Sequence, residues 1–84
     1  MSENPSQITM YGTRWCYDSK KARRILEENK IPFTFIDIDD DMDGRRFVEK
    51  VNNGNRSVPT IVFTDGSILV EPSSAELREK LGVG

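Results

Sequence analysis

Two strand-like segments with a helix-like segment between them constrain the fold of this chain more than any other feature. Residues 7–11, QITMY, are rich in β-forming types and roughly alternate between polar and apolar side chains. From Tyr17 the apolar side chains recur at helical spacing, and we expect Asn29 and Lys30 to end the helix, because asparagine tolerates a left-handed C-terminal position and Pro32 prevents continuation. Residues 33–38, FTFIDI, alternate again. Because strand–helix–strand units close with a right-handed crossover, we expect these two strands to be parallel.

The second half of the chain predicts another helix and a hairpin. Residues 40–52 carry apolar side chains at helical spacing after an acidic start, which suits the positive end of a helix dipole. Residues 60–64 and 67–71 are strand-like. They flank Asp65-Gly66, a pair typical of the tight turn in an antiparallel hairpin.

A capping box begins the last predicted helix. Ser73 is followed three residues later by Glu76, Leu77 and Leu81 supply an apolar side, and Gly82 ends the helix. The predicted order is therefore β-α-β-α-β-β-α, an α/β fold with a central four-stranded mixed sheet flanked by three helices. With 84 residues the chain is expected to form one domain, 1–84, whose core spans about 7–82.

Net charge and residue content argue against several classes of function. A net charge of −2 offers no basic surface to nucleic acid or to an anionic membrane. No apolar run reaches the ~18 residues of a membrane helix, and the short polar start MSENPSQ is unlike a signal peptide. The absence of histidine removes Ser–His and Cys–His catalytic pairs and the usual zinc sites. With one cysteine and no disulfide framework, we expect a monomer in the reducing cytoplasm, without a bound metal.

The only cysteine, Cys16, lies in the segment TRWCYDS, at the junction between the first strand and the first helix. That position places its sulfur beside free backbone N–H groups and the positive end of the helix dipole. Both favour the reactive thiolate, as does the nearby charge of Arg14, whereas Asp18 opposes it. A lone cysteine in a core is an inert small hydrophobe, but polar neighbours at such a junction indicate a nucleophile.

Three features in this order resemble the glutaredoxin family, and hence the thioredoxin fold. They are a cysteine after Trp15 at the start of the first helix, the segment VPT opening the third strand, and the order of the elements. Within the family, the segments TRWCYDS, NGNRSVPT and DGSILVEPS most resemble the mycoredoxins and related short bacterial glutaredoxin-like proteins. The likeness covers about residues 7–82. It implies a thiol–disulfide oxidoreductase with a cis peptide bond before Pro59.

The resemblance also implies a site. Cys16 corresponds to the family's nucleophile, and a low-molecular-weight thiol, glutathione or mycothiol, would act as co-substrate without any bound cofactor. A helix N-terminus such as the one at Ser73 suits an anionic part of that thiol. The segment VEPSS departs from the family pattern before the last helix, which leaves the identity of the thiol open. The positions implied to line the thiol groove are Arg14, Tyr17, Arg56, Val58, Pro59, Ser73 and Ser74.

A second departure concerns the resolving position. Many dithiol members have a second cysteine where this chain has Ser19, so the motif is CxxS in place of CxxC. A serine hydroxyl forms no disulfide, whereas Cys16 alone can still exchange a small thiol with a mixed disulfide. We therefore predict a monothiol mechanism acting on protein mixed disulfides. The sequence does not distinguish a native Ser19 from an engineered replacement of cysteine.

Other functions stay open at this point. A monothiol glutaredoxin can carry an iron–sulfur cluster between two chains, each giving Cys16, although Tyr17-Asp18 would place bulk and charge beside it. A thioredoxin-fold binding module with an inert thiol is another alternative. Residues 39–44, DDDMDG, match the opening of a calcium-binding loop, but its twelfth position is Lys50 where a glutamate is required. We interpret this acidic run as a solvated helix start.

Overall fold

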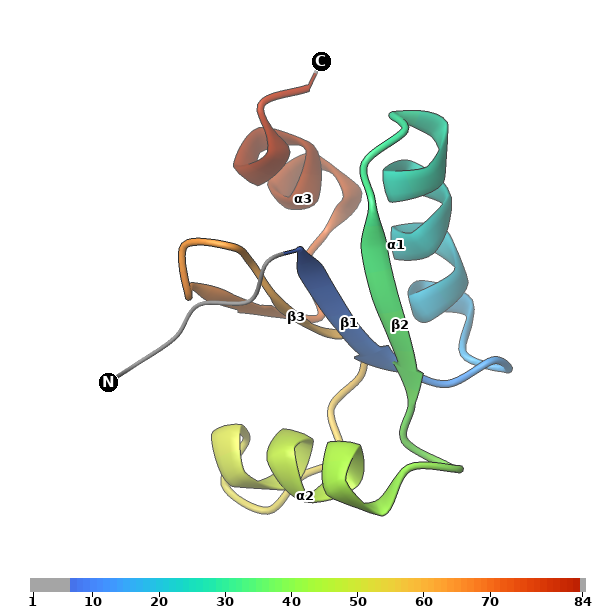
Figure 1. The fold of residues 1–84 in the computed structure, drawn as a ribbon, viewed down its shortest axis with the longest axis vertical. Coiled ribbons are helices and arrows are strands. Elements are labelled where there is room, and N and C mark those ends of the chain that lie inside the picture. Colours follow the sequence, from blue (N-terminus) through green and yellow to red (C-terminus); the bar gives the residue numbers. More distant parts are fainter. Residues whose placement is uncertain (1–6, 84) are drawn as a thin grey trace.

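The computed structural model describes residues 7–83 and shows the predicted order of elements (Figure 1). The bounds are β1 (Ile8–Gly12), α1 (Tyr17–Glu28), β2 (Phe33–Asp37), α2 (Met42–Val51), β3 (Thr60–Val62), β4 (Ile68–Val70) and α3 (Ser74–Leu81). Within the described residues, no helix is both long and apolar enough to cross a membrane.

The strands form one mixed four-stranded sheet in the order β2-β1-β3-β4. β1 pairs with β2 in parallel and with β3 in antiparallel orientation, and β3 pairs with β4 in antiparallel orientation. The predicted crossover and hairpin are therefore confirmed. Both hairpin strands are shorter than the sequence predicts, with three residues each, because Phe63 and Ser67 already belong to the turn around Asp65-Gly66.

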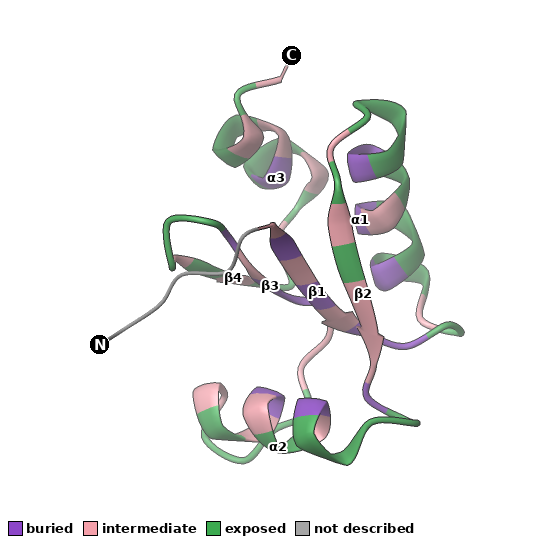
Figure 2. Ribbon diagram, viewed as in Figure 1, coloured by how far each residue is buried: buried purple, intermediate pink, exposed green. Residues whose placement is uncertain are grey.

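The helices lie on both faces of the sheet, with α1 and α3 on one face and α2 on the other (Figure 1). The buried residues of α1 lie on the side of the helix that faces the sheet, as expected for an amphipathic helix (Figure 2). Alternation along β1 sends Ile8 and Met10 into the core on this side. The buried core residues are Ile8, Met10, Ala22, Ile25, Leu26, Ile61, Phe63 and Leu77.

The opposite face of β1 meets α2. The ring of Tyr11 stacks on Phe47, with 4.7 Å between the ring centroids. Gly44 brings the α2 backbone so close that a Cβ there would lie 2.8 Å from Cγ2 of Ile36. Burial, followed by the negative charge of Asp41, raises the pKa of Tyr11.

The helix ends follow local sequence rules, with one exception. Ser73 and Glu76 form the predicted capping box, and Gly82 has the predicted left-handed conformation. The first helix ends at Asn29 and Lys30 as predicted, but the left-handed residue is Lys30, with a φ of 55°, whereas Asn29 has a φ of −94°. Asn29 instead donates its side-chain amide to the carbonyl of Ile25, 2.8 Å away, so the turn is stabilised by a side chain.

Candidate active site

The pairing of the strands brings four chain segments together at one end of the sheet, which we call the active-site edge. Gly12 pairs with Asp37, Tyr11 with Thr60, and Thr60 with Val70. The ends of β1, β2 and β4 and the start of β3 therefore lie side by side. A hydrogen bond of 2.8 Å from the N–H of Glu71 to the carbonyl of Pro59 joins the segments around β3 and β4.

Cys16 is the N-cap residue of α1 and is partly exposed at this edge. Its carbonyl accepts the N–H of Lys20 at 3.0 Å, while its side chain makes no capping hydrogen bond. Among residues 7–83, the N–H groups of Tyr17, Asp18 and Ser19 have no acceptor. These donors and the positive end of the helix dipole face the start of α1, where they can interact with a negatively charged group. Cys16 is partly exposed there, and its role as the nucleophile stays a prediction.

The peptide bond between Val58 and Pro59 is cis, as the resemblance implies. Pro59 is buried and Val58 is partly exposed. Thr60 anchors this segment, because its hydroxyl donates to the carbonyl of Ser57 at 2.7 Å and accepts from Asn52 at 3.2 Å. The N–H and C=O of Val58 have no partner among the described residues, and they are free to pair with an extended ligand.

A surface hollow lies between α1 and the start of α3 and includes both predicted serines. Lys21 is the one cation among its lining residues, and sequence reasoning missed it. Positions 18, 21, 22 and 25 have the spacing of one helix face, which the sequence shows. That this face meets the start of α3, however, is visible only in the structure. The hollow is lined by Asp18, Lys21, Ala22, Ile25, Pro72, Ser73, Ser74 and Leu77.

The two predicted serines have different roles at the start of α3. The N–H of Ser73 donates to the carboxylate of Glu76 at 2.8 Å, and its hydroxyl accepts the N–H of Glu76 at 3.1 Å. The backbone N–H of Ser73, and to a lesser extent its hydroxyl, lower the pKa of the Glu76 carboxyl. The N–H groups of Ser74 and Ala75 have no partner among the described residues. Ser73 therefore builds the cap, while the next two N–H groups remain available to an anion.

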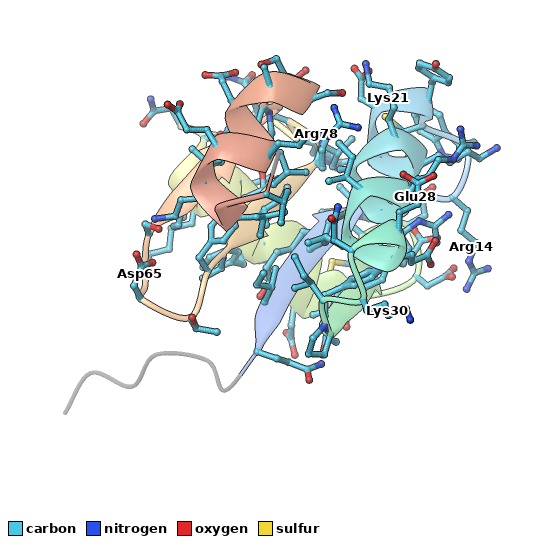
Figure 3. The ribbon with its side chains drawn as sticks, turned by 90° about the horizontal axis from the view of Figure 1, so that it is seen from above. Arg14, Lys21, Glu28, Lys30, Asp65 and Arg78 are labelled. Atoms are coloured by element: carbon cyan, nitrogen blue, oxygen red, sulfur yellow. The ribbon has the colours of Figure 1, made fainter. Side chains whose placement is uncertain are left out.

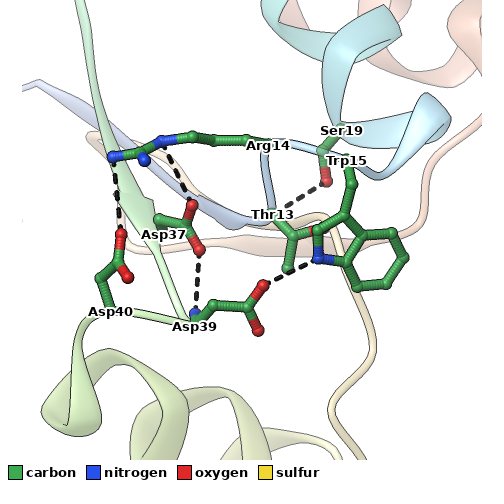
Figure 4. Close-up of polar contacts among 7 residues, drawn as sticks. All are labelled: Thr13, Arg14, Trp15, Ser19, Asp37, Asp39 and Asp40. Atoms are coloured by element: carbon green, nitrogen blue, oxygen red, sulfur yellow. Dashed lines mark hydrogen bonds and ion pairs between the residues drawn. The ribbon is translucent and has the colours of Figure 1, made fainter.

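The two predicted arginines are engaged by carboxylates. Arg14 lies 3.4 Å from Asp37 and 3.5 Å from Asp40, on the side of α1 away from α3 (Figures 3 and 4). Arg56 forms an ion pair of 2.8 Å with Glu49 of α2. Neither arginine lines the hollow, and their proposed roles in holding a small thiol stay predictions.

Tyr17, the aromatic residue after the nucleophile, is 72% exposed, and the ammonium of Lys21 lies 5.7 Å from its ring centroid. It can therefore cover a ligand without rearrangement of the core. Ser19, at the resolving position, is instead fully buried under the loop that follows β1. Its hydroxyl accepts the N–H of Thr13 at 3.5 Å (Figure 4).

The acidic run after β2 is occupied by contacts within the protein. Asp41 caps α2 by accepting the N–H of Gly44 at 2.9 Å, and Asp39 and Asp40 contact Trp15 and Arg14. Within residues 7–83, no group of three or more histidine, cysteine, aspartate or glutamate residues is arranged to hold a metal ion.

A partly exposed cysteine at a helix N-terminus, a cis-proline segment with unpaired backbone groups and this order of elements are the features of a thiol–disulfide oxidoreductase of the thioredoxin fold. The fold assignment agrees with a solved thioredoxin-like protein variant, whose structure superimposes with a TM-score of 0.82 at 20% identity, covering 95% of this chain and 100% of that chain.

The sequence profile of the glutaredoxin family matches residues 8–68, and the chain belongs to that family. A protein of Mycobacterium tuberculosis that bears the name glutaredoxin is 40% identical over 74 residues, covering 88% of each chain. Mycoredoxin 1 of Corynebacterium glutamicum is 34% identical over 76 residues, 90% of this chain and 94% of its own. The crystal structure of a Methanosarcina mazei glutaredoxin is 29% identical with a TM-score of 0.72, covering 90% of this chain and 78% of that one.

Proposed function

We propose that this protein removes a low-molecular-weight thiol from protein mixed disulfides by a monothiol mechanism. The thiolate of Cys16 attacks the small-thiol sulfur of the mixed disulfide, and the disulfide bond to the protein breaks as the protein thiolate leaves. A second small-thiol molecule, as its thiolate, then attacks the same sulfur. This step releases a small-thiol disulfide and restores the thiolate of Cys16.

The observation that carries the proposal is the pair of Cys16 and Ser19. Cys16 is the only cysteine in the chain, and Ser19 occupies the position from which a second thiol would attack. Without that thiol, an intramolecular disulfide cannot form, so the small thiol on Cys16 must leave by intermolecular exchange. The family assignment supports the redox chemistry, and the residue content of this chain supports the monothiol route.

The hollow between α1 and α3 supports a position for the small thiol. Its sulfur would lie at Cys16 and its extended part would pair with the backbone of Val58. A carboxylate or other anionic group would reach the unpaired N–H groups of Ser74 and Ala75, with Lys21 beside them. Asp18 also lines the hollow and limits the net positive charge there, so we expect weak binding of the small thiol.

The proposed reaction requires a reducing compartment, because the small thiol must be regenerated from its disulfide. We therefore place the protein in the cytoplasm, where it would act as a monomer. Size-exclusion chromatography with light scattering checks the oligomeric state. The iron–sulfur alternative requires two chains around one cluster, and it predicts a dimer with a visible absorption band after anaerobic reconstitution.

Mass spectrometry of the protein treated with oxidised glutathione or oxidised mycothiol tests the first half-reaction. We expect one adduct on Cys16, which excess reduced thiol removes, and no adduct on the Cys16→Ser variant. A wild-type protein that forms no adduct with either disulfide contradicts the proposal.

A pair of matched variants tests the position of the small thiol. Lys21→Gln removes the cation of the hollow, whereas Lys20→Gln removes an exposed cation of the same helix that does not line it. We expect Lys21→Gln to raise the KM for the small thiol about three- to fivefold, the effect of one screened charge contact, and Lys20→Gln to leave it nearly unchanged. Equal effects of both variants would show that only the general charge matters.

A further inference from the structure

The two residues that precede the nucleophile are both held by one turn, which we call the acidic turn and which comprises residues 37–41. The indole N–H of Trp15 donates to the carboxylate of Asp39 at 2.8 Å (Figure 4). The guanidinium of Arg14 lies 3.4 Å from Asp37 and 3.5 Å from Asp40. These contacts join residues 23 or more positions apart in the sequence. They thus connect the loop before Cys16 to the end of β2.

The acidic turn is itself fixed to the sheet and to α2. The side chain of Asp37 is only 9% exposed, and its carboxylate accepts the N–H of Asp39 at 2.9 Å. The N–H of Ile38 donates to the carbonyl of Gly12 at 2.9 Å. Arg45 of α2 donates to the carbonyls of Ile38 at 3.0 Å and Asp39 at 3.2 Å. The turn therefore offers the loop a support that does not depend on the loop's own conformation.

These contacts are poorly suited to a role in global stability. Trp15 is 73% exposed, and the side chain of Arg14 is 75% exposed, so water screens the ion pairs and competes for the indole N–H. An exposed tryptophan also leaves apolar surface in water, at a cost that its hydrogen bond does not offset. The contacts do join the loop that leads to Cys16 to the turn after β2.

We propose that Asp39 is a positioning residue for the nucleophile. Asp39 holds the indole of Trp15, and Asp37 and Asp40 hold Arg14. The acidic turn thereby keeps the Cys16 loop aligned with the hollow between α1 and α3, where the small thiol would lie. This inference rests on the proposed exchange reaction. Thiol–disulfide exchange needs the attacking sulfur in line with the disulfide bond, and small displacements of a reacting group reduce rates strongly. The acidic residues would then act through Trp15 and Arg14, without touching the substrate.

Asp39→Ala, which removes the acceptor, is the main test. We expect kcat for reduction of a glutathione mixed disulfide to fall about five- to tenfold while the KM for the small thiol changes little. Alkylation of Cys16 by iodoacetamide needs no alignment with the hollow between α1 and α3. The alkylation rate of Asp39→Ala should therefore differ less than twofold from that of the wild-type protein. Asp39→Asn keeps an acceptor oxygen and should restore most of the activity. Trp15→Phe removes the donor at an exposed site and should reproduce the effect of Asp39→Ala.

Asp43→Ala is the matched control, because Asp43 is an exposed aspartate of the same acidic stretch without a contact to Arg14 or Trp15. It removes the same charge and should leave the exchange rate within twofold. Trp15 is the only tryptophan, so its fluorescence reports the contact directly. Its fluorescence anisotropy should fall in Asp39→Ala, because the exposed indole gains freedom to rotate, and should not fall in Asp43→Ala.

Two results would overturn the inference. One is an unchanged kcat in Asp39→Ala, whether or not the anisotropy of Trp15 changes, and the other is an equal loss of activity in Asp43→Ala, which would indicate a charge effect. The fluorescence measurement does not need catalysis. A wild-type protein without exchange activity would therefore refute the proposed function, while the anisotropy comparison would still decide whether Asp39 holds Trp15.

Discussion

The hydroxyl of Ser19 lies 3.5 Å from the backbone nitrogen of Thr13 and accepts its N–H in a fully buried position. The residue at the resolving position is therefore a structural support between α1 and the loop that leads to Cys16. Buried polar groups need partners, and here the serine oxygen supplies one for a backbone group that water cannot reach.

Ser19→Ala is predicted to lower stability while the chemistry persists. The substitution leaves the buried N–H of Thr13 without its acceptor, which costs about 1 kcal/mol, at the low end because the hydrogen bond is long. Chemical denaturation measures the loss, and a mixed-disulfide assay measures the activity, which should stay within about threefold. Complete loss of exchange activity in a folded Ser19→Ala protein would refute the monothiol mechanism, since it would give the hydroxyl an essential role.

Ser19→Cys is predicted to gain the reduction of internal protein disulfides. The new thiol would lie three residues after Cys16, at the third position of the helix that Cys16 caps, so it can displace a protein thiol from Cys16 and form an intramolecular disulfide. Turnover of a disulfide-containing protein should rise from background to a measurable rate. No gain, despite two titratable thiols, would show that the buried position prevents attack.

Gly12→Ala is predicted to destabilise the protein by about 2 kcal/mol through overpacking. A Cβ at Gly12 would lie 2.6 Å from Oγ and 3.0 Å from Cβ of Ser19, and 3.2 Å from Cε1 of Phe35. Combining it with Ser19→Ala removes the nearest atom, so the double variant should lose less stability than the sum of the single losses. Thermal or urea unfolding measures the coupling, and simple additivity would contradict the proposed contact.

Ser73 allows capping and anion binding to be separated. Ser73→Ala loses the N-cap and should cost about 1 kcal/mol of stability. Ser73→Asp keeps a capping oxygen but adds a negative charge beside the unpaired N–H groups of Ser74 and Ala75, so stability should be retained while the KM for an anionic small thiol rises about fivefold. An unchanged KM in Ser73→Asp would place the anionic group of the thiol elsewhere.

Asp65 should make stability dependent on pH in the acidic range. The hydroxyl and then the N–H of Ser67, followed by the ammonium of Lys80, lower the pKa of Asp65 well below its ordinary value of 3.8. Because the pKa of Asp65 is lower in the folded state, its ionised form contributes to the free energy of unfolding. This contribution is fully present above the pKa of Asp65 in the unfolded chain and is lost as the pH falls below that value.

Asp65→Asn is therefore predicted to lower the melting temperature at neutral pH, by a few degrees at most because the group is exposed. The difference from the wild-type protein should narrow progressively below about pH 4. Lys80→Met should show part of the same loss, since the ammonium of Lys80 lies 2.9 Å from the carboxylate of Asp65 and joins the hairpin turn to α3. A constant difference at all pH values would contradict the assignment.

Local features of the fold were predictable, and contacts between distant segments were not. The capping box at Ser73 and the turn at Asp65-Gly66 lie within a few residues, so their residue types carry the structure directly. Lys21 belongs to a helix face whose partner is α3. Only after α3 packs there does Lys21 become part of a hollow beside the site, whereas Arg14 turns to the acidic turn.

The sequence by itself determined the order of the elements, the single thiol and its place at a helix start, because periodicity and capping depend on neighbouring residues. Tertiary structure alone decided that Ser19 is buried against Thr13, that Asp39 holds Trp15 and that Lys21 faces the start of α3. These relations depend on strand register and helix packing, which join residues far apart in the chain. A side chain's chemistry is local, but the partner it meets is set by the whole fold.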